Sequence, residues 1–266
     1  MAVRYLTKEQ MIQKLSELAQ VGWVKSQRPL NSGGIGNTID SILGLPENNL
    51  PIADTAQWEL KTHRKGSSSL LTLFHMEPQP REHGVVVNTL LPTYGWPDQK
   101  RVGEQSFRQT IQATRISDRG FGIIIDRSKE KVRVYFDGSK IDSRHSSWLD
   151  DIKSRGGFHP LKPEPYWTFK ELFLKASTKL LNAFFVEAEA RRQMGDEFFR
   201  LSKLHVLQSL DLNNFVKATE SGTILIDFDA RSHHNHGTKF RIRQDSVPSL
   251  YRYVDTIVFS SSGSHD

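Results

Sequence analysis

The chain has 266 residues, 37% of them hydrophobic, and is therefore long enough to bury a substantial core without covalent cross-links. It contains no cysteine, which excludes disulfides, thiolate metal sites and zinc fingers. A formal net charge of +6 favours a polyanionic partner only modestly, because many basic proteins bind no nucleic acid.

No apolar run approaches the roughly eighteen residues that a membrane-spanning helix requires. The richest run is LLNAFFV, residues 180–186, and the N-terminal segment lacks the apolar core of a signal peptide. We therefore expect a soluble, cytoplasmic protein with no membrane partner.

Two helices are predicted near the N-terminus. Thr7 and Gln10 form a capping-box pattern before apolar residues at helical spacing, and Gly22 is expected to end that helix. Residues 32–44, SGGIGNTIDSILG, predict a glycine-rich turn and a short helix that ends at Gly44. Asn37 or Thr38 is the expected N-cap of this helix. The residues expected to face inward are Ile39, Ile42 and Leu43.

Two strands are predicted next. The alternation of strand side chains places Trp58 and Leu60 on one face, and Gln57, Glu59 and Lys61 on the other. A loop, residues 63–69 (HRKGSSS), then leads to a second strand at residues 70–75 (LLTLFH).

The rest of the chain predicts a mixture of strands and helices. Residues 85–91 form a short helix or strand, 106–115 a strand, and 121–138 a hairpin that turns near 127–130. The proline-rich stretch 158–167 is the best candidate for a boundary or crossover between lobes. Further helices are expected after Thr168 and at 211–221, strands at 180–190, 198–207 and 223–230, and a disordered tail at 260–266. The pattern is that of a mixed α/β protein.

Residues 54–61, DTAQWELK, carry two carboxylates and a lysine. The hard oxygen donors of Asp54 and Glu59 suit Mg²⁺, for which Mn²⁺ is expected to substitute. Lys61 can orient water or stabilise developing negative charge, and the short helix would bring Asp40 towards the strand. The combination predicts a metal-dependent nuclease, although an Asp, a Glu and a Lys at free spacing also occur by chance.

A basic cluster lies near the C-terminus. If KFRIR is a strand, three cations share one of its faces: Lys239, Arg241 and Arg243. Taken alone, this pattern is typical of a charged face in water. His234 and His236 could ligate a metal, but no third ligand lies nearby in the sequence, and a DNA contact or a buried hydrogen bond is favoured.

Four segments carry a resemblance to known proteins: residues 34–50, 54–63, 69–75 and 234–242. Residues 109–115 and 166–189 fit the same order. Together they resemble the MvaI/BcnI family of type II restriction endonucleases, which share a catalytic core with the mismatch-repair nickase MutH.

The resemblance implies an α/β fold (α+β, with a mixed sheet) that contains a restriction-endonuclease-like PD-(D/E)xK core. It also implies a second lobe that forms a DNA-binding cleft. Residues 1–266 would be one unit of two lobes, with the catalytic core including 31–75 and a DNA-recognition segment at 223–245. It also implies a monomeric, Mg²⁺-dependent endonuclease that cuts double-stranded DNA at a short CC-N-GG-type site by sequential nicking. A prokaryotic cytoplasm fits this function, and a companion DNA methyltransferase is compatible with it. A MutH-like repair nickase and a catalytically silent DNA-binding module are the alternatives.

The family's site residues carry over position by position. Asp54 and Glu59 are the expected metal ligands, and Lys61 is the expected catalytic lysine. Asp40 stands where relatives often have glutamate, and its shorter side chain leaves metal contact open. The expected DNA contacts are His63, Arg64, His75, Arg115, His234, His236, Lys239, Arg241 and Arg243.

Two of these positions bear on the target sequence. Arg241 can offer a bidentate fork to guanine O6 and N7, which lysine cannot reproduce. One branch of the family reads the central base pair with two histidines, aligned with His75 and Lys239. This chain has one of the two, so CCSGG, CCWGG and CCNGG all stay open.

Overall fold

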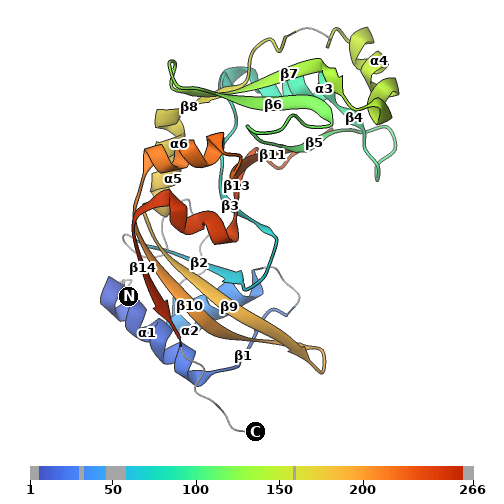
Figure 1. Cartoon of the computed structure of the whole chain (residues 1–266). Coiled ribbons are helices and arrows are strands. Elements are labelled where there is room, and N and C mark those ends of the chain that lie inside the picture. The colour runs from blue at the N-terminus through green and yellow to red at the C-terminus, as the bar shows by residue number, and fades with distance from the viewer. Residues whose placement is uncertain (1–5, 30–32, 46–57, 158–159, 260–266) are drawn as a thin grey trace. The chain divides into compact units, whose positions relative to one another are not determined.

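The computed structural model describes residues 6–29, 33–45, 58–157 and 160–259 (Figure 1). The chain divides into two compact units. Unit 1 comprises Met1–Ser69, Ser177–Asp211 and Tyr251–Asp266, and unit 2 comprises Leu70–Ala176 and Leu212–Leu250. No helix in the described part of the chain is long and apolar enough to cross a membrane.

Helix α1, Lys8–Val21, begins at the predicted capping box. The Thr7 hydroxyl accepts a hydrogen bond from the Gln10 backbone N–H at 3.2 Å, and the Thr7 N–H donates to Gln10 Oε1 at 3.0 Å. Gly22, at φ +80°, ends the helix as predicted. The sequence pattern therefore located both ends of this helix.

Thr7→Ala is expected to lower the free energy of unfolding by about 1 kcal/mol, because two N-terminal backbone donors lose their reciprocal arrangement. Urea denaturation followed by circular dichroism measures the loss. Thr7→Ser keeps the hydroxyl and is the control. Equal stability of the alanine variant and the wild type would contradict the capping role.

Helix α2, Gly34–Leu43, starts earlier than predicted, with Gly33 as its N-cap. The expectation that Asn37 or Thr38 caps it is wrong, because the helix has already begun and the Thr38 hydroxyl donates to the Gly34 carbonyl at 2.7 Å. Gly44 ends it in the left-handed region at φ +70°, as predicted. The buried stripe runs through Ile35, Ile39 and Leu43, so Ile42 is 45% exposed and its predicted inward orientation is wrong.

Among its described residues, the sheet of unit 1 has five strands: β1 Val24–Lys25, β2 Glu59–Arg64, β9 Asn182–Gln193, β10 Asp196–Leu210 and β14 Tyr251–Val258. Its order is β1-β10-β9-β2, and β14 also pairs with β10. β2 runs parallel to β9, with Glu59 opposite Ala183. His63 and Arg64 belong to β2, so their assignment to a loop is wrong, because the pairing with β9 continues to Ala188.

One face of this sheet forms the core of unit 1. Trp58 and Leu60 are buried on it, as the alternation predicted. They pack in one cluster with residues of α1, α2, β9 and β10, among them Met11, Leu15, Ile35, Ile39, Leu43, Phe184, Val186, Leu204 and Val206. The same alternation directs Glu59, Lys61 and His63 to the other face.

The described residues of unit 2 form two sheets. The larger has the order β3-β13-β11-β5-β4, with β12 also paired to β11, and the smaller has the order β6-β7-β8. The strands are β3 Leu70–His75, β4 Trp96–Pro97, β5 Gln105–Ile111, β6 Arg119–Asp126, β7 Lys131–Ile141, β8 Tyr166–Thr168, β11 Ile224–Arg231, β12 His234–Asn235 and β13 Lys239–Arg243. The predicted strands at β3, β11 and β13 and the β6–β7 hairpin are confirmed.

The helices of this part include α4 Ser146–Ser154, α6 Leu212–Glu220, and α5 Phe169–Leu180, whose last residues from Ser177 on belong to unit 1. Shorter helical segments are η1 Arg81–His83, η2 Val86–Leu90, α3 Leu91–Tyr94, η3 Ser143–His145 and η4 Gln244–Leu250. The ambiguous segment 85–91 is therefore helical. The predicted helix starting at Thr168 is α5, with Thr168 and Glu171 bonded reciprocally.

Three further predictions concern the proline-rich stretch, the strand at 106–115 and the C-terminal tail. The proline-rich stretch lies inside unit 2, so its interpretation as a boundary is wrong. The strand expected at 106–115 ends at Ile111, and a short turn bridged by Gln112 and Arg115 follows. The tail 260–266 lies outside the described residues.

The larger sheet of unit 2 separates apolar from charged side chains. Ile224, Ile226 and Phe228 of β11 are fully buried, as are Phe240 and Ile242 of β13. The alternating residues of the same strands therefore lie on the opposite face, where aspartates of β11 meet cations of β13.

Candidate functional site

Glu59, the first residue of β2, is a buried carboxylate with 1% of its surface exposed. Two ammonium groups contact the same oxygen of this side chain. Lys61 Nζ donates a short hydrogen bond to Glu59 Oε1, and Lys179 Nζ lies 3.5 Å from that atom. Because a buried charge is costly unless it is paired, these two ammonium groups favour the ionised form of the carboxyl group.

The two lysines reach Glu59 by different routes. Lys61 is two residues further along β2 and therefore on the same face. Lys179 is in the last turn of α5, just before β9, whose residue Ala183 is opposite Glu59. Lys179 was missed in the sequence, because its place beside Glu59 depends on the parallel pairing of two distant strands.

The other predicted catalytic residues lie before this strand. Asp54 is among residues 46–57, outside the described residues. Asp40 is half-buried on α2, a helix that packs on β2, with Gly36 close against Thr62. The helix therefore lies against the strand, whereas the predicted approach of Asp40 itself and its metal contact stay predictions.

A divalent cation fits the donor chemistry of Glu59, a hard carboxylate oxygen that already attracts positive charge. Within residues 6–29, 33–45, 58–157 and 160–259, no three His, Asp or Glu side chains form a group able to hold a metal ion. Asp54 as the second carboxylate of such a site stays a prediction, because it lies outside the described residues.

His63 and Arg64 follow on β2 with partners inside unit 1. The His63 ring stacks on Phe185 with centroids 4.6 Å apart, and its Nε2 is 3.9 Å from Glu187 Oε2. Arg64 Nη2 donates to both carboxylate oxygens of Glu197, at 2.9 and 3.1 Å. DNA contact by His63 or Arg64 stays a prediction, and for Arg64 it would have to compete with this ion pair.

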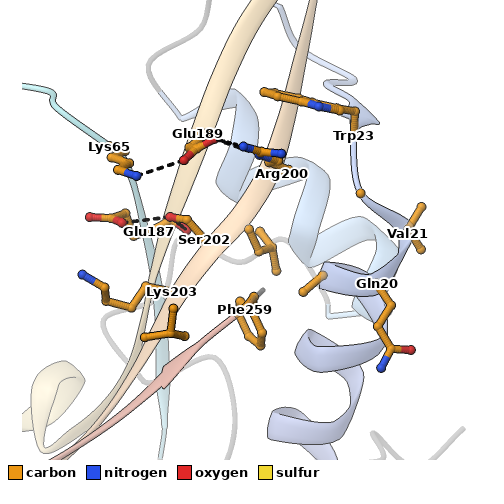
Figure 2. A pocket seen from close by; sticks show the side chains of 14 residues that line it. Gln20, Val21, Trp23, Lys65, Glu187, Glu189, Arg200, Ser202, Lys203 and Phe259 are labelled. Carbon is orange, nitrogen blue, oxygen red and sulfur yellow. Dashed lines mark hydrogen bonds and ion pairs between the residues drawn. The ribbon is translucent and has the colours of Figure 1, made fainter. Parts of the chain in front are cut away.

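A pocket of about 490 Å³ also lies in unit 1 (Figure 2). Figure 2 shows Lys65 and Arg200 directed at Glu189, which they contact at 2.9 and 2.7 Å. Neither Glu59 nor Lys61 lines this pocket. It is therefore separate from the candidate catalytic carboxylate.

In unit 2, the charged face of the larger sheet carries a network of ion pairs. Asp229 accepts a hydrogen bond from Lys239 Nζ at 2.7 Å and forms an ion pair with Arg108 Nε at 2.9 Å. Asp227 lies 3.3 Å from Arg241 Nη1, while Arg241 Nη2 donates to the Leu70 carbonyl at 3.1 Å. These contacts orient two of the predicted DNA-contacting cations, Lys239 and Arg241.

Asp227 and Asp229 were missed as site residues, although their alternation with Ile226 and Phe228 in the sequence already placed them on the polar face of β11. Burial raises the pKa of Asp229, but the hydrogen bond and charge of Lys239, with the charge of Arg108, outweigh it and hold that pKa below its usual range. The carboxylate is therefore ionised at neutral pH.

His75 lies opposite Lys239 in the pairing of β3 with β13. Burial lowers the pKa of His75, the Lys239 charge lowers it further, and Glu77 opposes the shift. The imidazole is therefore neutral at pH 7, with one ring nitrogen able to donate a hydrogen bond and the other able to accept one.

The lowered pKa of His75 predicts a pH effect on stability. Below about pH 6.5 the unfolded chain binds a proton at His75 before the folded protein does, so acid favours unfolding, whereas above that pH His75 contributes nothing. His75→Gln should lose less thermal stability than the wild type between about pH 7.5 and pH 5. Thermal unfolding at both pH values, with exposed His83→Gln as the control substitution, checks this. Identical pH dependence of His75→Gln and the wild type would contradict it.

The remaining predicted contacts are exposed. His234 Nε2 lies 3.2 Å from His236 Nδ1, so the two imidazoles contact each other. Partial loss of hydration lowers the pKa of His236, Asp229 opposes this, and His234 and Lys239 lower it further. Arg243 ends β13, and Arg115 closes the short turn after β5. In the described part of the chain no group of metal-binding side chains includes the two histidines.

The fold, the buried carboxylate–lysine pair and a family-model match define the class of protein as a restriction endonuclease, an enzyme that cuts DNA at specific sites. The matched model is described as the MvaI/BcnI restriction endonuclease family and spans residues 12–251. The chain belongs to this family, which confirms the resemblance, and it is a type II site-specific deoxyribonuclease.

Solved structures with the same fold support this placement. The complex of restriction endonuclease MvaI with its cognate DNA substrate superposes with a TM-score of 0.72 at 23% identity, covering 96% of this chain and 100% of that one. MvaI in the absence of DNA gives 0.55 at 24% identity, covering 92% and 97%. No curated protein sequence matches the chain.

Proposed function

We propose that this protein is a Mg²⁺-dependent endonuclease that cuts double-stranded DNA at a short CC-N-GG-type site, nicking one strand at a time as a monomer. The observation that best supports this proposal is that Glu59, buried at the start of β2, contacts Lys61 in a chain of the MvaI/BcnI family. The likeness to an MvaI structure described as a cognate DNA substrate complex supports double-stranded DNA as the substrate.

Glu59 and Asp54 would hold the metal ion, with Asp40 as a further candidate. When bound, a divalent cation polarises a phosphoryl oxygen and favours ionisation of water, and Mn²⁺ would serve in place of Mg²⁺. Lys61, whose ammonium touches Glu59, would orient the attacking water and stabilise negative charge on the phosphate. Water would form a bond to phosphorus as the bond to the 3′ oxygen breaks, leaving a 3′-hydroxyl and a 5′-phosphate.

Base reading would fall to the charged face of unit 2. Arg241, held by Asp227 and the Leu70 carbonyl, would present its fork to a guanine, while His75 and Lys239 would lie together at the central base pair. Unit 1 would thus carry catalysis and unit 2 recognition. The remaining DNA contacts would come from His63, Arg64, Arg115, His234, His236 and Arg243.

A supercoiled plasmid incubated with Mg²⁺ or with EDTA tests the proposal. Nicked and then linear product at discrete sites, dependent on Mg²⁺, is expected. Sequencing of the fragment ends would identify the target among CCSGG, CCWGG and CCNGG. Persistent nicking would instead indicate a repair-like nickase, and an intact plasmid with a retained gel shift would indicate a DNA-binding module.

A further inference from the structure

Two cations share one carboxylate oxygen in the candidate active site. Lys61 Nζ and Lys179 Nζ both contact Glu59 Oε1, and Glu59 is almost completely buried. The lysine side chains keep 24% and 28% of their surface exposed. Two partly exposed ammonium groups therefore face one oxygen of a buried carboxylate.

The backbone around Lys179 is firmly anchored. Ala176 and Leu180, on either side of it in the last turns of α5, are buried at 0% and 3% exposure. Two residues after Leu180, β9 begins and pairs with β2 at Glu59. The fold thus fixes the backbone of Lys179 close to Glu59, whereas the side chain of Lys179 is partly exposed and can change its conformation.

We propose that Lys179 is a positioning residue, the counter-cation of Glu59 in the metal-free enzyme, which a divalent cation must displace to reach the carboxylate. The inference rests on the proposed function, since it takes Glu59 as a metal ligand. A divalent cation at Glu59 would add two positive charges beside the two ammonium groups already there, and repulsion between like charges is poorly screened at a buried site. Lys61 belongs to the proposed catalytic set and would remain beside Glu59. Lys179 is therefore the ammonium group that would move away from Glu59 when the metal ion binds.

A second explanation has a different consequence. A lysine in the last turn of a helix is favourable for the helix itself, because it faces the negative end of the helix dipole. If that were the whole role, removing the charge would lower thermal stability and leave metal affinity unchanged. The counter-cation role instead predicts that metal affinity rises when the charge is removed.

The test is a Mn²⁺ titration of the full-length protein without DNA, read by the electron paramagnetic resonance signal of free Mn²⁺. Lys179→Gln is expected to tighten Glu59-dependent Mn²⁺ binding about tenfold, or about 1.4 kcal/mol. Lys179→Met, also neutral, should behave alike and serves if the glutamine variant folds poorly. Lys179→Arg keeps the charge and should bind Mn²⁺ like the wild type, as should Lys170→Gln, an exposed lysine on the same helix.

Glu59→Gln defines which binding counts as Glu59-dependent. Equal Mn²⁺ affinity in the wild type and both neutral variants would overturn the counter-cation role while leaving the proposed function intact. Absence of any Glu59-dependent Mn²⁺ binding in all of these proteins would instead overturn the metal assignment itself, and this inference with it.

Discussion

Glu59→Gln is expected to reduce the rate of DNA cleavage about a thousandfold while DNA binding stays within about twofold of the wild type. The substitution keeps the shape of a buried side chain but removes its negative charge, and with it an oxygen donor for the metal. Several kcal/mol of transition-state stabilisation would be lost, and each 1.36 kcal/mol corresponds to a factor of ten in rate. Lys61→Ala should behave similarly, because it removes the ammonium that touches Glu59.

Single-turnover plasmid cleavage in Mg²⁺ and a gel shift in Ca²⁺ measure the two properties separately. Glu189→Gln is a matched control, because Glu189 lies on β9 of the same unit in ion pairs with Lys65 and Arg200 and does not contact Glu59 in any interaction described. Cleavage at the wild-type rate by either Glu59→Gln or Lys61→Ala would remove that residue from the catalytic set.

Arg241→Lys should lower the discrimination between the cognate duplex and a duplex with one guanine changed by about 10- to 100-fold. The guanidinium is oriented by Asp227 and the Leu70 carbonyl, and a lysine keeps the charge but not the planar fork. Arg241→Ala should lose the same discrimination and also bind more weakly, since it removes the charge as well.

Equilibrium binding to both duplexes, measured in Ca²⁺ at several salt concentrations, checks this. Arg243→Lys is the control: Arg243 is exposed at the end of β13, and a phosphate contact there carries no sequence information. Arg243→Ala should weaken both duplexes alike and reduce the salt dependence by about one charge. Full discrimination by Arg241→Lys would exclude Arg241 as the guanine reader.

Local patterns predicted the parts of the structure that depend on neighbouring residues. The capping boxes at Thr7 and Thr168 located two helix starts, and the alternation around Glu59 separated its core face from its charged face. The start of α2 was misjudged because glycine allows a helix to begin without a side-chain cap, at Gly34 rather than after Gly36.

Features that depend on distant pairing were not predictable from one sequence. β14 was missed, and Lys179 gave no local sign of its place beside Glu59, because both depend on which strands adjoin β9 and β10. Asp227 and Asp229 illustrate an intermediate case. Their face was predicted from alternation, but their cationic partners became evident only once β11 lay between β13 and β5.

The aspartates of β11 have a consequence for how the enzyme would search a genome. Ion pairs with Asp229 and Asp227 already engage three cations of this face: Lys239, Arg108 and Arg241. These three cations are therefore less available to the phosphates of non-cognate DNA. A DNA phosphate can bind one of these cations only if the ion pair with the aspartate breaks, which costs binding free energy. Only the cognate bases can offset that cost, by forming new hydrogen bonds. Wrong sequences would then be released quickly, although the protein as a whole is basic.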